Sequence, residues 1–432
     1  MKDIKNIYVI GRQNPDLDSV ASSIGYAELK NKIDSDNNYV AAASGTINLD
    51  TQKVLSNFSV TLPKYIMDLN LRVADVMTQN TIVANQDMPV TEVFKIMLKN
   101  DLRVIPITDN NQQFIGYFGM IDIAKKSISS VIPDIFRKIK TSVEMISKAI
   151  DGEILNNANG SEMFIANVVM GIMDVDGFMN IIQRFDPENM IMITGNRRDL
   201  QEKAIDIGVR CIIVSNGYRL DEELTEKAKQ NGVSIILSEY DAFATAGLTE
   251  WSVPVSILTD KNSITAKPEN LINDIKELVY ASNNRSVIVT DLNNSVVGII
   301  TRTDIIKYNK RKVILMDHSS SSNSPSGIFN CNILEIIDHH KLGDIQTGSF
   351  TRYRIEPWGS TSSIVTDEFI KHSVKPSKTT ALILSSGILV NTKCLSQNKT
   401  KSEDLYMIKW LCKQYDIDIN NLMSEVKRII NL

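Results

Sequence analysis

The chain has 432 residues, of which 43% are apolar, with 47 basic against 51 acidic side chains. This composition is typical of globular proteins and excludes a disordered chain. A formal net charge of −4 argues against general nucleic-acid binding, which needs a basic face. The apolar runs are shorter than the ~20 residues of a membrane span, and the chain begins with no signal-peptide pattern. With four cysteines and no CxxC pair, we expect a soluble, cytoplasmic protein of roughly three domains.

The first predicted elements are a strand at Lys5–Gly11 and a helix at Asp18–Asn31. The turn Asn14-Pro15-Asp16-Leu17-Asp18 joins them, and its proline ends the strand. This turn places Asp16 and Asp18 at the carboxyl edge of a parallel sheet, where such sheets bind ligands. The following segment, Thr46–Tyr65, completes no sheet, so we expect the first strand to find its partners later in the chain.

A repeat follows, in which matching residue numbers differ by 182. Arg103–Asp109 matches Arg285–Asp291, and Gly116–Asp122 matches Gly298–Asp304. Each copy predicts a helix, two strands around an Asn-rich turn, and a second helix that opens at an Asp. The first helices are expected at Thr91–Lys99 and Pro268–Tyr280. Such βαββα units are marginal alone, so the two copies should pair face to face.

The repeats resemble the CBS-domain family, whose paired modules bind adenine nucleotides. The resemblance implies that a Thr or Ser and an Asp, in the pattern G-h-h-[ST]-x-x-D, hold the ribose. The second copy has both residues, Thr301 and Asp304. The first copy keeps Asp122 but has Gly119 at the hydroxyl position. The alternative is that each Asp is only the N-cap of its helix.

Between the repeats lies a further α/β segment that resembles the DRTGG domain, with Gly195-Asn196-Arg197 at the name-giving turn. A strand, a glycine turn and a helix in this order can cradle phosphate on free amide groups. Any α/β layer needs such a turn, however, so this feature alone is weak evidence. The predicted elements are strands at Met190–Gly195, Cys211–Ser215 and Val233–Leu237 and a helix at Asp199–Gly208.

The last third of the chain adds two apolar strands, and polar residues follow each of them directly. Lys312–Met316 precedes Asp317-His318, and Ile333–Ile337 precedes Asp338-His339-His340. Three of the four histidines therefore lie at strand ends. Converging carboxylates and imidazoles suit Mn²⁺, Co²⁺ or Mg²⁺, and a pair of such ions could activate water and hold a phosphoryl group. The alternative is that Asp18 is a helix N-cap and the Asp-His-His run an exposed turn.

The segments before and after the repeats are each incomplete as a domain, and together they form one. Thr361–Lys371 and Thr379–Leu389 supply further strands and helices to it. We therefore predict an α/β fold in which a parallel-sheet domain is split by an inserted regulatory region, with breaks near Leu69 and Lys310. The predicted parts are a first half at 1–68, a CBS module at 69–130, a DRTGG-like domain at 131–250, a second CBS module at 251–310 and the second half at 311–432.

Four segments resemble the DHH phosphoesterase superfamily and, within it, the family II inorganic pyrophosphatases: GRQNPDLDSVASSIGYAELKNK, LMDH, IIDHHKLGD and IEPWGSTSSIV. One subgroup of that family carries a CBS–DRTGG–CBS insert. The resemblance implies a dinuclear Mn or Co site that hydrolyses pyrophosphate. It implies that Asp16 and Asp18 ligate separate ions, Asp317 bridges both, His339 is a ligand and His340 contacts substrate. It also implies an insert inhibited by AMP and ADP and activated by ATP or diadenosine polyphosphates.

The sequence departs from the family pattern at three places. Arg12 stands where the family has a ligand His, and a guanidinium has no lone pair to offer a cation. We expect its charge at the vacated ion position, within reach of Asp16 or Asp317. Asn391 stands where the family has a ligand Asp. Because the chain stops at Leu432, we also expect the DHH-associated domain, which brings Lys and Arg to pyrophosphate, to be absent.

These departures predict weak or absent pyrophosphate hydrolysis and one bound ion or none. The protein would then be a nucleotide-responsive binding protein or partner subunit, and a homodimer by analogy with other CBS pairs. Two alternatives remain. One is an active metal-dependent pyrophosphatase or small-phosphoester hydrolase with a single ion at Asp18, Asp317 and His339. The other is a scaffold that binds neither nucleotide nor metal.

Overall fold

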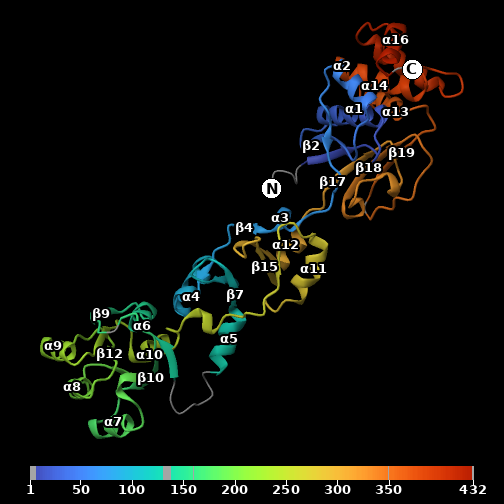
Figure 1. The fold of residues 1–432 in the computed structure, drawn as a ribbon. Helices are drawn as coiled ribbons and strands as arrows, with labels where there is room; N and C mark the ends of the chain where they lie inside the picture. The colour runs from blue at the N-terminus through green and yellow to red at the C-terminus, as the bar shows by residue number, and fades with distance from the viewer. Residues whose placement is uncertain (1–5, 130–137, 159, 349, 431–432) are drawn as a thin grey trace. The chain divides into compact units, whose positions relative to one another are not determined.

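The computed structural model describes residues 6–129, 138–158, 160–348 and 350–430 (Figure 1). The chain forms two compact units. One consists of Met1–Val76 and Lys307–Leu432, and the other of Met77–Ile306. The two ends of the chain therefore belong to the same unit, as the interrupted-domain prediction requires, and the predicted α/β fold class is confirmed.

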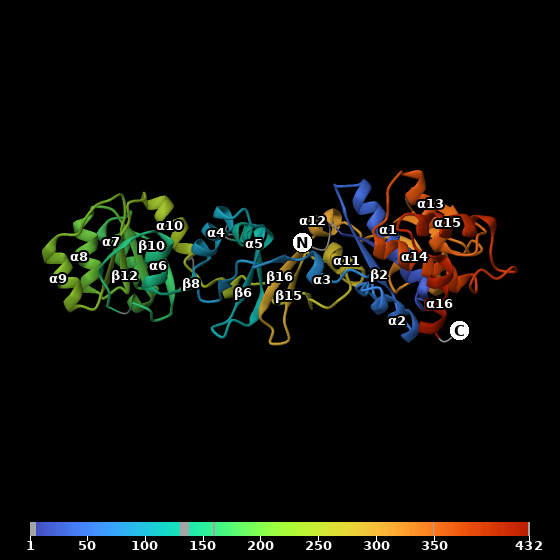
Figure 2. The same cartoon turned by 90° about the horizontal axis from the view of Figure 1, so that it is seen from above.

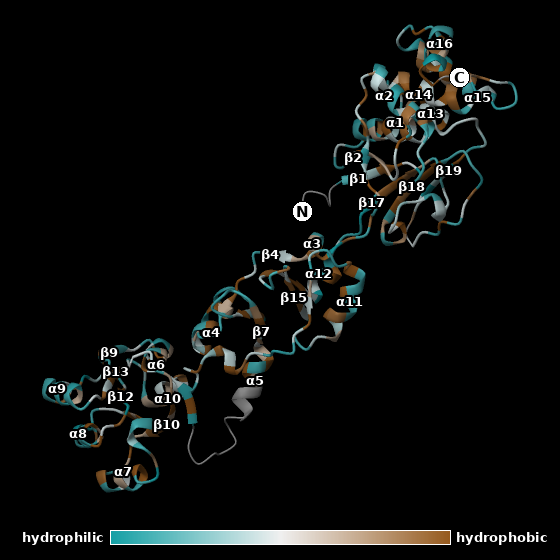
Figure 3. Cartoon of the chain, in the orientation of Figure 1, coloured by the Kyte–Doolittle hydropathy of each residue, from teal (hydrophilic) through white to brown (hydrophobic). Residues whose placement is uncertain are grey.

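The first unit is built on one parallel sheet in the order β19-β18-β17-β1-β2-β3. Ile7 lies opposite Lys312, so the first strand pairs with a strand from the far end of the sequence. The apolar strands β17 and β18 stand out in brown in Figure 3. The strands are β1 (Asn6–Ile10), β2 (Asn38–Ala43), β3 (Lys64–Tyr65), β17 (Lys312–Met316), β18 (Asn332–Asp338) and β19 (Arg352–Ile355).

The expectation that the first strand has no local partner is wrong. β2 pairs with β1 along its length, in parallel register, and β3 extends the sheet beyond it. The sequence of β2, NYVAAA, ends in three alanines, which have low strand propensity and conceal the strand. Lys5, the predicted first residue of β1, lies outside the described residues.

Helices cover the face of this sheet on which Ile7 and Val9 lie, and α1, α13 and α14 pack against one another there. Thr361–Lys371 and the segment around Thr379–Leu389 are both helices. The opposite face, with Tyr8 and Ile10, is covered by loop residues. The helices are α1 (Leu17–Ile33), α2 (Leu49–Asn57), α3 (Val73–Val76), α13 (Thr361–Lys371), α14 (Lys378–Asn391), α15 (Ser402–Lys413) and α16 (Ile419–Ile430), with 3₁₀ turns η4 (Ser321–Asn323) and η5 (Ile328–Asn330).

The second unit contains both repeats, and their elements keep the difference of 182 in residue number. β4 precedes the first module in the chain but pairs with β16 of the second. The first module contains β5 (Ala84–Asn85), α4 (Val90–Lys99), β6 (Val104–Thr108), β7 (Phe114–Gly119) and α5 (Met120–Ser129). The second contains β14 (Thr265–Ala266), α11 (Ile272–Ala281), β15 (Ser286–Thr290), β16 (Val296–Thr301) and α12 (Arg302–Lys307), with β4 at Thr78–Gln79.

The two modules pair face to face, as predicted, and lie next to each other in Figure 2. Gln113 forms an antiparallel bridge with Ser295, its own counterpart in the repeat. Tyr117, Ile288 and Ile299 share one buried apolar cluster drawn from both modules. The second repeat helix begins at Ile272 rather than at Pro268, because residues 267–270 form a turn in which the Asn270 side chain accepts from the Lys267 amide.

The segment between the modules forms a six-stranded sheet in the order β8-β10-β11-β12-β13-β9, parallel from β10 to β13 with an antiparallel strand at each edge. One face packs against α6, α10 and the first repeat module, and the other against α7, α8 and α9. Its strands are β8 (Lys138–Thr141), β9 (Glu153–Asn156), β10 (Phe164–Met170), β11 (Met190–Thr194), β12 (Cys211–Val214) and β13 (Ser234–Leu237). Its helices are α6 (Val143–Ala149), α7 (Val175–Ile182), α8 (Arg198–Asp206), α9 (Glu222–Gln230) and α10 (Ala242–Glu250), with η2 (Pro187–Asn189) and η3 (Val255–Ile257).

Among the described residues, no helix has both the length and the apolar character that a bilayer crossing requires.

Candidate metal centre

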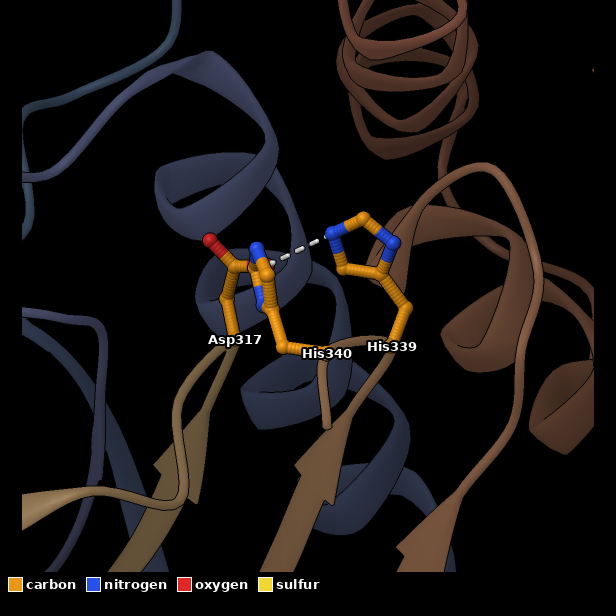
Figure 4. Close-up of side chains that lie close together, drawn as sticks. All are labelled: Asp317, His339 and His340. Atoms are coloured by element: carbon orange, nitrogen blue, oxygen red, sulfur yellow. Dashed lines mark ion pairs between the residues drawn. The ribbon is translucent and has the colours of Figure 1, made fainter. Parts of the chain in front are cut away.

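Acidic and histidine side chains meet at the carboxyl edge of the first unit's sheet. Asp317 follows β17, and His339 and His340 follow β18 (Figure 4). The Nε2 atom of His339 lies 3.6 Å, and the Nδ1 atom of His340 3.9 Å, from the Oδ1 atom of Asp317. One ligand atom from each of the three residues lies within 4.8 Å of the others. This donor set fits a divalent ion.

Asp317 is the most confined member of this cluster. Its side chain is buried, and its backbone has a φ of +64°, a left-handed conformation that costs a non-glycine residue roughly 1–2 kcal/mol. Burial, with the charges of Asp18 and Asp16, raises the pKa of the Asp317 carboxyl well above its usual value. Thr361 donates to its Oδ1 atom at 2.9 Å, while Oδ2 has no hydrogen-bond partner among the described residues. A buried carboxylate with a spare oxygen needs a cation beside it.

Arg12 supplies one such cation. Its Nη2 atom donates to Asp16, and its Nε atom lies 3.6 Å from the Oδ2 atom of Asp317. The predicted pairing of the guanidinium with Asp16 is confirmed. Asp16 is also the N-cap of α1, because its Oδ1 atom accepts from the Ser19 amide at 3.0 Å. The alternative that Asp18 caps this helix is therefore wrong, since Asp18 lies inside the first turn.

Asp18 is fully engaged by donors from two distant helices. Its oxygens accept from the backbone amides of Thr361 at 2.8 Å and Ser362 at 2.9 Å, the first residues of α13. The Nδ2 atom of Asn391, at the end of α14, donates to it at 3.0 Å. Burial raises the pKa of the Asp18 carboxyl, and the charge of His339 opposes that shift.

Asn391 lies at the centre of the site. Besides Asp18, its Nδ2 atom contacts the carbonyl of Gly359 at 3.0 Å and the Nε2 atom of His339 at 3.2 Å. All three neighbours are acceptors, so the nitrogen of the amide and not its oxygen must face them. An aspartate here would present an oxygen to the same acceptors and would need a cation between them.

The two histidines of the cluster are held by different partners. His339 Nδ1 lies 3.1 Å from the carbonyl of Trp358, which makes Nδ1 the protonated nitrogen and leaves the lone pair of Nε2 to accept from Asn391 at 3.2 Å. His340 Nδ1 lies 2.8 Å from Asp338. This hydrogen bond raises the pKa of the half-exposed His340 imidazole.

The acceptors of this site differ in how far they are already engaged. One ligand atom from each of Asp317, His339 and His340 lies within 4.8 Å of the others. The oxygens of Asp16 and Asp18, in contrast, are already paired with backbone amides, a guanidinium and a carboxamide. Sequence reasoning missed Trp358, Gly359, Thr361 and Ser362, although the segment IEPWGSTSSIV marked the region as part of a family motif.

The candidate nucleotide residues differ between the two CBS-like modules. Thr301 Oγ1 donates to Asp304 at 2.7 Å, and the Thr301 amide donates to the same carboxylate at 2.8 Å. In the first module the Gly119 amide donates to Asp122 at 2.9 Å. A Cβ atom at Gly119 would lie 3.0 Å from the Asn284 side chain. Asn284 therefore occupies part of the space that a Thr or Ser side chain would need at this position. The alternative that each Asp is the N-cap of its helix is wrong, because Asp122 and Asp304 lie inside the first turns of α5 and α12 and accept from the residue that precedes each helix. A ribose contact stays a proposal.

The DRTGG-like turn is closed by its own side chains. Arg197 pairs with Asp199 at 2.7 Å, and Gln201 donates to the carbonyl of Gly195 at 2.7 Å. The turn therefore contributes no separate evidence for a phosphate site.

Comparison with known proteins matches residues 145–251 to the DRTGG domain and residues 73–129 and 256–311 to the CBS domain. The cobalt-dependent inorganic pyrophosphatase of Clostridium perfringens is 30% identical over 414 residues, which cover 96% of this chain and 74% of that protein. A probable manganese-dependent inorganic pyrophosphatase of Thermotoga maritima is 28% identical over 426 residues, which cover 99% of this chain and 77% of that protein. The crystal structure of the CBS and DRTGG domains of the Clostridium perfringens pyrophosphatase, complexed with diadenosine tetraphosphate, is 26% identical and covers 54% of this chain and 100% of that one, with a TM-score of 0.48.

The parallel sheet with its acidic and histidine edge, interrupted by a CBS pair around a DRTGG domain, defines a DHH-type α/β protein with an inserted regulatory region. Within that class, the chain belongs to the manganese- and cobalt-dependent inorganic pyrophosphatases of family II, among the members with a CBS–DRTGG–CBS insert.

Proposed function

We propose that this protein is an adenine-nucleotide-responsive regulatory or binding member of the family that hydrolyses pyrophosphate poorly or not at all. One observation carries the proposal. At the two positions where this chain departs from the family's metal ligands, it has a hydrogen-bond donor that contacts the remaining acceptors. Arg12 contacts Asp16 and Asp317, and Asn391 contacts Asp18 and His339. A cationic or amide donor at a ligand position competes with an ion for the same lone pairs.

The proposed metal content is one Mn²⁺ or Co²⁺ ion or none, and an ion would be held by Asp317 and His339 with His340 nearby. A bound ion would polarise a phosphoryl oxygen, as divalent ions do in phosphoryl transfer. His340 is the proposed contact to substrate, because it is half exposed and hydrogen-bonded to Asp338 in a way that favours its protonated form. Asp16 and Asp18 belong to the same site, but their contacts support pairing with donors instead of ion binding.

The proposed regulatory ligands are AMP, ADP, ATP and diadenosine polyphosphates, bound in the CBS pair through Thr301 and Asp304, and through Asp122 in the first module. The CBS matches and the contact between Thr301 and Asp304 support this assignment. We further propose a cytoplasmic homodimer whose parts have the boundaries expected above.

A second function is favoured by the cluster of Asp317, His339 and His340. With one ion bound there, the protein would be a metal-dependent pyrophosphatase or small-phosphoester phosphohydrolase under nucleotide control. The geometry of the cluster supports this candidate, because Asp317 Oδ1 lies 3.6 Å from His339 Nε2 and 3.9 Å from His340 Nδ1.

Phosphate release and thermal unfolding separate these functions. Phosphate release from pyrophosphate is measured with Mn²⁺ or Co²⁺, with and without each nucleotide, and Asp317→Asn serves as the inactive control. We expect release no greater than in the control. We also expect at least one nucleotide to raise the free energy of unfolding by about 2.7 kcal/mol at a hundred times its dissociation constant.

Thr301→Val should remove that stabilisation, whereas Thr303→Val, an exposed neighbour on α12, should keep it. Release well above the Asp317→Asn level would establish the phosphohydrolase instead. Unfolding that is insensitive to all four nucleotides would refute the regulatory function and favour the scaffold.

A further inference from the structure

We propose that Asp404, which lies outside every motif of the candidate metal centre, is the residue that positions its ligands. Asp404 lies in the first turn of α15 and is completely buried. Its Oδ1 atom accepts from the Ser363 hydroxyl at 2.5 Å. Its Oδ2 atom accepts from the Gly359 amide at 2.9 Å and from the Lys401 amide at 2.8 Å. A buried carboxylate held by three donors fixes the segments that carry them.

Helix capping accounts for only one of these contacts. An acid at the third position of a helix commonly accepts from the amide of the N-cap residue, here Lys401. Gly359 and Ser363 lie 45 and 41 positions away in the sequence and belong to the segment that leads into α13. A Cβ atom at Gly359 would lie 2.3 Å from Asp404 Oδ2 and 2.8 Å from the Lys399 carbonyl. The glycine is therefore required for this close approach of the backbone to Asp404.

The segment from Trp358 to Ser363 contacts four residues of the metal centre, among them Asp317, which accepts from the Thr361 hydroxyl at 2.9 Å. The Trp358 carbonyl accepts from His339 Nδ1, and the Gly359 carbonyl accepts from Asn391 at 3.0 Å. Backbone amides later in the same segment donate to Asp18. Asp404 holds this segment at Gly359 and again at Ser363. The ring orientation and tautomer of His339 thus depend on a carboxylate that does not itself reach the ion site.

Loss of this carboxylate should act through His339. In Asp404→Asn the amide oxygen can still accept from Gly359 and Lys401, but the nitrogen faces Ser363, whose hydroxyl must then accept instead of donate. Loss of the negative charge weakens all three contacts, so the segment is held less firmly. The Trp358 carbonyl then no longer selects the His339 tautomer with Nδ1 protonated. Changes to the partners of ligand histidines typically lower metal affinity by about 10–100-fold. The affinity effect rests on the proposed single-ion site, whereas the tautomer effect does not.

The test compares full-length wild type, Asp404→Asn and the control Glu403→Gln. Glu403 is the neighbouring acid on α15, and its side chain accepts from the hydroxyl of Ser402. Long-range ¹H–¹⁵N spectra of histidine-labelled protein report the tautomer of His339, assigned with His339→Gln. A titration of Mn²⁺ followed by electron paramagnetic resonance reports affinity. Far-ultraviolet circular dichroism and thermal unfolding confirm that each variant is folded.

We expect Nδ1-protonated His339 in wild type and in Glu403→Gln, and a mixture of tautomers with about 10–100-fold weaker Mn²⁺ binding in Asp404→Asn. Wild-type tautomer and affinity in a folded Asp404→Asn would overturn the proposal, as would equal changes in Glu403→Gln. If wild type itself binds no Mn²⁺, the single-ion site fails and the tautomer alone decides on Asp404. If Asp404→Asn does not fold, Ser363→Ala removes one of the three contacts, and an unchanged tautomer there refutes the proposal.

Discussion

Position 12 determines how the carboxylates of the metal centre are compensated. Asp16 raises the pKa of Asp18, and both raise the pKa of Asp317, so a free set of three would be strongly unfavourable when buried. The Arg12 guanidinium opposes the rise in the pKa of Asp317 and pairs with Asp16. This chain therefore carries its own counter-ion, on a side chain that is always charged at physiological pH.

The double variant Arg12→His, Asn391→Asp should restore ion dependence. It returns an imidazole lone pair and a carboxylate to the two altered positions and removes the internal cation. Without added metal we expect this variant to unfold at a lower temperature than wild type, because buried carboxylates lose their donors. With Mn²⁺ or Co²⁺ we expect it to gain stability and to release phosphate from pyrophosphate at least about 10-fold faster than wild type.

Thermal unfolding with and without Mn²⁺, beside phosphate release, measures both effects. Arg12→Gln is the matched control, because it removes the charge without adding a ligand for the ion. If the double variant unfolds at the same temperature with and without metal, Arg12 and Asn391 are not what prevents the site from depending on an ion.

At the scale of elements, the two hairpin turns of the CBS pair are equivalent in backbone but not in chemistry. Gln112 and Asn294 occupy matching positions with φ values of +63° and +62°. Asparagine tolerates this left-handed conformation better than glutamine. The Asn294 side chain also donates to the carbonyl of Phe114 in the other module at 2.9 Å, whereas no such contact is recorded for the Gln112 side chain among the described residues.

Glycine substitutions at these two positions should therefore change stability in opposite directions. Gln112→Gly relieves a strained backbone and should raise the free energy of unfolding by about 0.5–1 kcal/mol. Asn294→Gly loses the contact with Phe114 and should lower it by about 1 kcal/mol. Urea unfolding of the full chain measures both, and a stabilised Asn294→Gly would contradict the role given to its side chain.

Elements with strong local signals could be predicted from the sequence, and those fixed by distant partners could not. The apolar run of β17 and the β6–β7 hairpin with its repeat were evident from periodicity and turn residues. β2 was concealed by its alanines, because its place beside β1 depends on packing and not on propensity. In the metal centre, the pairing of Arg12 with Asp16 could be predicted because an arginine stands where the family pattern has a ligand histidine. The contacts of Asp404 and of the α13 amides depend on a long-range approach that no local pattern contains.

On the scale of the whole molecule, each unit has its own hydrophobic clusters. The described members of the core clusters in the first unit all come from residues before Met77 or after Ile306, and those of the second unit all lie between these residues. Separate cores of this size are the usual condition for independent folding.

A fragment of Met77–Ile306 should fold alone and unfold cooperatively, and it should keep the nucleotide response of the full chain. Met1–Val76 expressed alone should stay unfolded, since β1 then lacks β17 and the helices α13 and α14 that cover its face. Circular dichroism and urea unfolding of the two fragments test this. A folded Met1–Val76 would show that β17 is dispensable for the first half of the sheet.

The pairing of β1 with β17 also sets an order of events during synthesis. Because Ile7 lies opposite Lys312, the central pair of the sheet cannot form until the whole insert has left the ribosome. At ~5–20 residues per second, the roughly 300 intervening residues take on the order of 15–60 s. During that time the apolar strand β1 and the apolar positions of α1 have no core to enter, while the insert can fold. The nascent N-terminal segment is therefore the part of this protein most dependent on protection by chaperones, and faster elongation would shorten its exposure.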